Sequence, residues 1–161
     1  MFQGAHEVDP LNVGAIVNLG ALEYEHNNYE NAAIRFLDAL EVKPDDEEAL
    51  CNLALSLKKT NYLEFAQSAF EEAVNVSPGN TFILHNYMLF LLEQKNFTHF
   101  DKVMMHARRV MDKSELETVT KLYEEFKSAI EGTEGKVLPE DQEPKTFSAS
   151  ILKSAIKKAF G

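Results

Sequence analysis

The sequence repeats itself with a period of 34 residues. Repeats of this length are units that cannot cover their own apolar faces, so they stack into arrays of at least three. The repeat therefore predicts a stacked array. Five columns of residues keep one register: Pro10, Pro44 and Pro78; Ala5, Ala39, Ala73 and Ala107; Val8, Val42, Val76 and Val110; Phe2, Phe36, Phe70 and Met104; and Asn18, Asn52 and Asn86.

Each period contains two apolar patterns of helical spacing, separated by a polar turn at 26–28 or 59–61. Pro44 and Pro78 end the second helix, because proline cannot continue a helix and restricts the residue before it. The low content of 7 Gly and 5 Pro also fits long helices and short turns. The sequence thus predicts an all-α fold. The expected helices are 13–26, 29–43, 47–60, 63–77, 81–94, 97–111 and 115–131.

The residues of the period resemble the tetratricopeptide repeat (TPR), with a Leu-Gly pair in the first helix and then Ala, aromatic, Ala and Pro in the second. Repeats are assigned to 13–46, 47–80 and, in degenerate form, 81–114. The resemblance implies a superhelical array of helical hairpins, whose first helices line a concave surface. The segment 69–97 also resembles tetratricopeptide subunits of the BBSome, a ciliary coat, which implies a ciliary place.

Small residues at matched positions predict close helix crossings. Gly20 and Ala54 on first helices are expected to face Ala32 and Ala66 on second helices. The third repeat departs from this pattern, because large residues replace the small ones and predict a wider or rotated hairpin. These residues are Met88 and Phe100, with Asp112 in place of the proline. The side chains expected in the core are Phe36, Phe70, Leu53, Ala39 and Ala73.

The segments that flank the repeats have distinct compositions. Residues 1–12 match the second half of a preceding repeat or form an N-terminal cap, and Phe2, Ala5 and Val8 are expected to pack on the first helix of repeat one. Residues 115–131 are predicted to form a capping helix that begins with a capping box of Ser114 and Glu117. An acidic linker, 132–145, and a basic amphipathic helix, 146–161, are expected to follow.

The charge and the apolar pattern exclude several classes of partner. A net charge of -10 opposes binding to the phosphate backbone of nucleic acids. No apolar run approaches the length of a transmembrane helix, and the start of the chain lacks a secretory signal pattern. A single cysteine, Cys51, cannot form an internal disulfide, which fits a reducing compartment. The sequence therefore favours the cytoplasm, with the cilium as the alternative that the resemblance adds.

No catalytic or metal-binding motif occurs in the sequence. HExxH, CxxC, phosphate-binding and dinucleotide-binding patterns are absent, and His99 and His106 have no third ligand nearby. The many carboxylates lie on polar helix faces, and Cys51 is expected to be a free buried thiol. The chain is therefore predicted not to be an enzyme and to hold neither a metal nor a cofactor.

The asparagine column is the principal candidate for partner binding. Side-chain amides both donate and accept hydrogen bonds, so Asn18, Asn52 and Asn86 could clamp the backbone of an extended peptide. The alternative is that they bond to a neighbouring helix. Tyr24 and Phe82 are further groove candidates. A clamp for a terminal carboxylate is not expected in these repeats, because only Asn52 matches that residue set and the cations are missing.

The C-terminal segment is the second candidate. It carries three lysines and no acid, while the rest of the chain has a charge of -13. It could fold back onto the acidic array, dock on a partner, or lie on a membrane surface. Charge favours folding back, and three lysines are few for membrane binding. The docking residues proposed for this helix are Phe147, Ile151, Ile156, Lys157 and Phe160.

These features favour a non-catalytic scaffold that binds protein or peptide partners within a larger assembly. The rival reading is a substrate-binding or regulatory arm of an enzyme whose catalytic domain lies outside this chain. The sequence does not separate the two, because both need the same groove.

Overall fold

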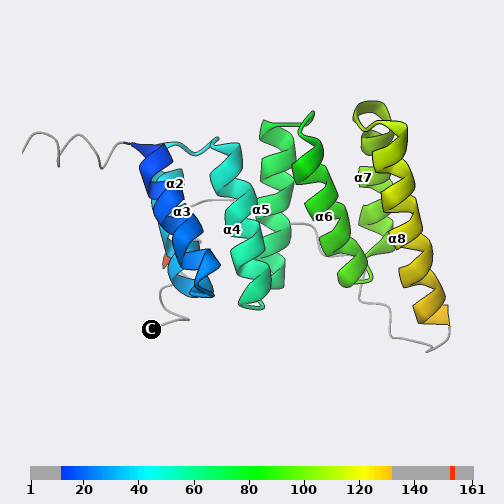
Figure 1. Ribbon diagram of the computed structural model, residues 1–161, viewed down its shortest axis with the longest axis horizontal. Helices are drawn as coiled ribbons and strands as arrows, with labels where there is room; N and C mark the ends of the chain where they lie inside the picture. Colours follow the sequence, from blue (N-terminus) through cyan, green and yellow to red (C-terminus); the bar gives the residue numbers. More distant parts are fainter. Residues whose placement is uncertain (1–11, 132–152, 155–161) are drawn as a thin grey trace, which may run out of the picture. The chain divides into compact units, whose positions relative to one another are not determined.

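The structure is a computed structural model that describes residues 12–131 and 153–154 (Figure 1). The described part is helical and contains no strand, as the sequence predicted. Its helices are α2 (Val13–Glu25), α3 (Tyr29–Val42), α4 (Glu47–Lys59), α5 (Leu63–Val76), α6 (Thr81–Glu93), α7 (Phe97–Val110) and α8 (Lys113–Glu131).

The described helices belong to two compact units. The first holds α2 to α5 together with residues 153 and 154, and the second holds α6 to α8. In the first unit each helix packs against the next, so that α2–α3 and α4–α5 are hairpins joined through α3 and α4 (Figure 1). This arrangement is compatible with a helical repeat array.

The core of the first unit contains the residues that the repeat predicted. All five lie at 0% exposure, so this prediction is confirmed; they are Phe36, Phe70, Leu53, Ala39 and Ala73. Ala32 and Ala66, on the second helices of the two hairpins, are also fully buried. Close packing at small residues therefore holds both hairpins together.

Three first helices begin with the same cap. Asn12, Asp46 and Asn80 recur at the 34-residue spacing, and each side-chain oxygen accepts a hydrogen bond from the backbone N–H three residues later, at 3.1, 2.9 and 3.2 Å. Such caps satisfy N–H groups that the helix itself leaves unpaired. They form a further repeat column that fixes where α2, α4 and α6 start.

The turns within the hairpins also repeat. Asn27, Asn61 and Lys95 lie 34 residues apart and have left-handed φ angles of 64°, 67° and 58°. The residue after each one donates its backbone N–H to a carbonyl five residues earlier, at 2.8 Å in all three turns. This is the pairing that closes a helix through a left-handed residue. This hydrogen bond closes the short polar turns that the sequence predicted at these positions.

The second helices α3 and α5 end where proline requires. Lys43 and Ser77 precede Pro44 and Pro78, and both have an extended φ of -135°. Proline disfavours the helical conformation of the residue before it. The predicted helix ends at these prolines are therefore confirmed within a residue.

Gly20 on α2 makes room for an aromatic ring. A methyl group at its Cβ position would lie only 2.6 Å from Cε1 of Phe36 on α3. The sequence predicted that Gly20 faces Ala32 on α3. The structure adds the ring of Phe36, which lies against Gly20 at the same helix crossing. The small residue allows α3 to bring its largest core side chain against α2.

The second unit is built differently. Met88 and Phe100 are both buried, and α6 and α7 lie in looser backbone contact than the helices of the two hairpins in the first unit. This agrees with the wide crossing predicted from two large residues. Tyr123 of α8 stacks on Phe100, with ring centroids 5.0 Å apart, and meets the ring of Phe97 edge-on. The aromatic rings therefore fill the space between α7 and α8.

The predicted capping box of α8 was wrong in position. Asp112 Oδ1 accepts the N–H of Glu115 at 2.8 Å, and Glu115 Oε2 accepts the N–H of Asp112 at 3.0 Å. Ser114 lies inside the helix. The reciprocal box forms two residues earlier than predicted because aspartate caps as well as serine does. Asp112, the residue in place of the third proline, therefore starts the next helix.

Several predicted segments lie outside the described residues. These are the N-terminal segment with Phe2, Ala5 and Val8, the linker 132–145, and residues 146–161 apart from Lys153 and Ser154. Among the helices that are described, none is long and apolar enough to cross a membrane.

Candidate partner-binding site

Asn18 and Asn52 occupy equivalent positions on the first helices of the two hairpins in the first unit. Asn18, on α2, is exposed, and Asn52, on α4, is half-buried. Neither side-chain amide forms a hydrogen bond within 12–131 or with residues 153 and 154. Both amides therefore retain donors and an acceptor for a ligand.

Asn86 differs from the other two asparagines. It lies on α6, in the second unit, and its Nδ2 donates to the carbonyl oxygen of Phe82 at 2.8 Å. This is the local bond to the preceding turn that short polar side chains form within helices. One donor of Asn86 is therefore used by its own helix. The neighbouring ring of Phe82 is 64% exposed, which leaves it accessible as a groove candidate.

Tyr24 belongs to an aromatic pair at the end of α2. Its ring meets that of Tyr29, at the start of α3, edge-on with centroids 5.0 Å apart. Burial raises the pKa of the Tyr24 hydroxyl, and the Tyr29 hydroxyl adds to this rise. Tyr24 therefore stays a neutral phenol and offers a hydrogen-bonding hydroxyl at the edge of the first hairpin.

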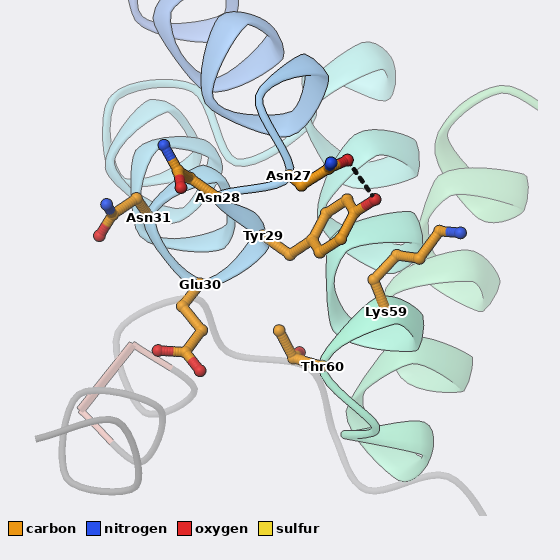
Figure 2. A pocket seen from close by; sticks show the side chains of 7 residues that line it. All are labelled: Asn27, Asn28, Tyr29, Glu30, Asn31, Lys59 and Thr60. Carbon is orange, nitrogen blue, oxygen red and sulfur yellow. Dashed lines mark hydrogen bonds between the residues drawn. The ribbon is translucent and has the colours of Figure 1, made fainter.

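The pair adjoins a polar pocket whose residues the sequence predicts only as turns. The pocket has a volume of about 350 Å³ and lies where the first turn approaches the end of α4 (Figure 2). We call it the turn pocket. It is lined by Asn27, Asn28, Tyr29, Glu30, Asn31, Lys59 and Thr60.

The turn pocket is held by contacts among its own residues. The Tyr29 hydroxyl donates to Oδ1 of Asn27 at 2.9 Å, and Lys59 Nζ lies 5.8 Å from the centre of the Tyr29 ring (Figure 2). Its lining offers amides, two hydroxyls, one cation and one carboxylate, which suit the binding of a polar group. The only sequence feature that could have indicated this pocket is the polar run 27–31. Such a run is also what a turn between two helices requires, so it does not point to a pocket.

An apolar stripe lies on α2. Leu19 and Leu22 are 50% and 52% exposed, and with Ala15 they share one helix face. The equivalent residues of α4, one period later, are all at 0% exposure; they are Ala49, Leu53 and Ser56. This face of α2 therefore has the chemistry of a buried surface while it is exposed in the described structure.

Candidate metal ligands do not cluster in the part of the chain that the structure describes. That part contains no group of three or more His, Cys, Asp or Glu side chains that could hold a metal ion. Cys51 is a free, buried thiol, as predicted, and burial raises its pKa to about 12. A thiol with so high a pKa is a poor nucleophile near neutral pH, because the thiolate is the reactive form.

The C-terminal docking residues Phe147, Ile151, Ile156, Lys157 and Phe160 lie outside the described residues. Lys153 is described, and it contacts α3 through Asp38 and Glu41. The sequence did not single out these two acids, because every helix of the first unit carries exposed or half-buried carboxylates.

A scan against protein-family models and a search of curated proteins both returned no match to this chain.

Proposed function

We propose that this chain is a non-catalytic scaffold of the tetratricopeptide type that binds an extended peptide or partner segment along its first helices. The observation that carries the proposal is the pair of amides on α2 and α4. Asn18 and Asn52 stand at the same point of successive first helices, and the side-chain amide of each forms no hydrogen bond among the described residues.

Such a pair suits the recognition of a peptide backbone. Each amide can donate to a backbone carbonyl and accept from a backbone N–H, so that both polar groups of a peptide unit are satisfied. Binding of this kind does not depend on the peptide's sequence. Specificity would then come from neighbouring groups, and the turn pocket, at the end of the helix that carries Asn18, supplies polar ones.

Membership of a larger assembly is part of the proposal. The exposed apolar stripe of Ala15, Leu19 and Leu22 supports it, because apolar surface of this kind favours contact with another protein segment. The single cysteine supports the proposed cytoplasmic location, and the sequence resemblance supports the ciliary alternative.

The amide pair can be tested with a displayed library of random extended peptides. Peptides selected on the full chain would be titrated by fluorescence anisotropy against the wild type, Asn18→Ala and Asn52→Ala. We expect each substitution to weaken binding by about 0.5–1.5 kcal/mol, the net value of one hydrogen bond, while the melting temperature stays unchanged.

The matched control is Asn75→Ala, which removes an exposed amide from α5 in the same unit. Its affinity should equal that of the wild type. If the selected peptides bind the two first-helix variants as tightly as they bind the control, the amides are structural and the proposal fails.

A further inference from the structure

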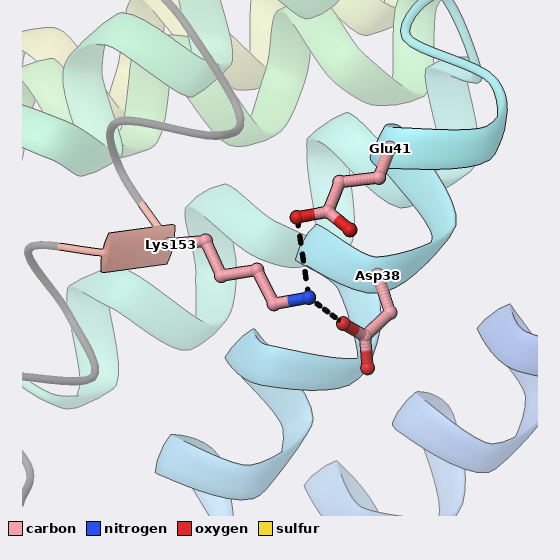
Figure 3. A network of polar contacts seen from close by, with 3 residues as sticks. All are labelled: Asp38, Glu41 and Lys153. Atoms are coloured by element: carbon pink, nitrogen blue, oxygen red, sulfur yellow. Dashed lines mark hydrogen bonds and ion pairs between the residues drawn. The ribbon is translucent and has the colours of Figure 1, made fainter.

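The structure places a lysine from the C-terminal segment between two carboxylates of α3. Lys153 Nζ forms an ion pair with Oδ1 of Asp38, and a second one with Oε1 of Glu41 at 3.2 Å (Figure 3). Asp38 lies 115 residues before Lys153 in the sequence. The contact therefore joins the C-terminal segment to the first hairpin.

Helix geometry explains why the two acids act together. Asp38 and Glu41 are three residues apart, which places them on one face of α3, one turn from each other. The residues between and beside them, Leu37, Ala39 and Leu40, are fully buried in the core. The rigid packing of α3 thus presents both carboxylates outward at a fixed spacing, and one ammonium group with three donors can bridge them.

Lys153 is held more closely than an ordinary surface lysine. Its side chain is only 15% exposed, whereas those of Asp38 and Glu41 are 32% and 41% exposed. Burial by itself lowers the pKa of the Lys153 ammonium, but hydrogen bonds and attraction from the two carboxylates outweigh it, so the net pKa is raised. The lysine therefore remains charged, and both acids contribute to offsetting its burial.

We propose that the Asp38–Glu41 pair on α3 is the docking site for the chain's own basic C-terminal segment, 146–161, with Lys153 as the anchoring residue. Charge complementarity supports this occupant, because the segment has three lysines and no acid whereas the rest of the chain has a charge of -13. Its apolar residues at helical spacing would add to the contact.

Of the three roles open to the C-terminal segment, this one is folding back onto the array. The contact lies on the second helix α3 and not on α2 and α4, which carry Asn18 and Asn52. The segment then acts as an intramolecular ligand with a high effective concentration. A partner that presents a basic amphipathic helix would compete with it for α3.

Hydrogen exchange of the full chain tests this docking without any partner, so its outcome is separate from that of the peptide experiment. Exchange of peptides covering 146–161 would be followed by mass spectrometry in the wild type, Lys153→Glu and Asp38→Lys. We expect either charge reversal to speed hydrogen exchange of this segment roughly fivefold. This is the shift in the equilibrium between docked and undocked segment that the loss of a partly exposed ion pair produces. Raising the salt concentration should act in the same direction.

A charge swap and a control make the test specific. Combining Lys153→Glu with Asp38→Lys should restore slow exchange, because opposite charges again face each other. Asp45→Lys makes the same change of charge at an exposed turn of the first unit and should have no effect. Unchanged exchange in the single variants, or a swap that restores nothing, would overturn the proposal.

Discussion

At the residue scale, the most informative positions are those that recur with the 34-residue period and differ in one member. The left-handed turn residues are Asn27, Asn61 and Lys95. Asparagine tolerates this conformation better than lysine does, so the third turn is built with a poorer residue. The departure falls in the repeat that also has the large crossing residues Met88 and Phe100.

Gly20 gives the clearest prediction at this scale. Gly20→Ala puts a methyl group where the ring of Phe36 lies, 2.6 Å away, so the crossing of α2 and α3 must widen. Overpacking costs about 1–3 kcal/mol, and the better helix propensity of alanine returns up to about 1 kcal/mol. We therefore expect a net loss in the free energy of unfolding, measured by urea denaturation.

Gly14→Ala is the matched control, because it changes the same residue type on the same helix. An added Cβ there meets only Oδ1 of Asn12, at 3.3 Å. This variant should be neutral or slightly more stable than the wild type. Equal gains from the two substitutions would show that Phe36 does not fill the crossing at Gly20.

The positions of the three asparagines could be predicted from the sequence. Whether each side-chain amide is hydrogen-bonded within its own helix could not. The 34-residue spacing placed Asn18, Asn52 and Asn86 at one register. A repeat pattern does not say which way a side chain turns, and Asn86 turns to its own helix at the carbonyl of Phe82. The choice depends on χ angles and local surroundings that sequence spacing does not carry.

At the element scale, helix positions followed closely from apolar periodicity, polar turns and prolines. Predicted bounds agree with the structure to within a residue or two because these signals are local. The structure adds the caps Asn12, Asp46 and Asn80, which did not enter the prediction. The start of α8 was predicted less well. Asp112 and Ser114 are both good caps, and only the bond pair with Glu115 decides between them.

The crossing of α4 and α5 supplies the prediction at this scale. Ala66 is at 0% exposure on the second helix of the hairpin, so Ala66→Leu would insert three carbon atoms into a filled core. We expect the free energy of unfolding to fall by about 1–3 kcal/mol in a denaturant titration. The same change at Ala129, which is exposed on α8, should cost much less. A melt of Ala66→Leu that matches the wild type would show that the crossing lies elsewhere.

At the scale of the whole molecule, packing between helices that are adjacent in sequence dominates the first unit. Each helix of the first unit packs against its neighbour in sequence, which is why a repeat pattern could predict it. The contact of Lys153 with Asp38 and Glu41 breaks that order and spans 115 residues. No local pattern marks a partner so distant, and the sequence supplied only the complementary charges.

The turn pocket is the part of the candidate site that the sequence did not predict. Composition and periodicity predicted an interaction scaffold and the asparagine column. The turn pocket arises where residues 27–31 meet Lys59 and Thr60 from the next hairpin. Its residues are separated in sequence, and each has an ordinary role in a turn or at a helix end, so only the fold brings them together.

The central claim is that Asn18 and Asn52 bind the backbone of a peptide partner. The most direct measurement is an NMR titration of the full chain that follows the side-chain NH₂ resonances of its asparagines as a selected peptide is added. The account predicts that the resonances of Asn18 and Asn52 shift together with saturation, while that of Asn75 on α5 stays in place. Shifts confined to other residues, with Asn18 and Asn52 unmoved at saturation, would contradict it.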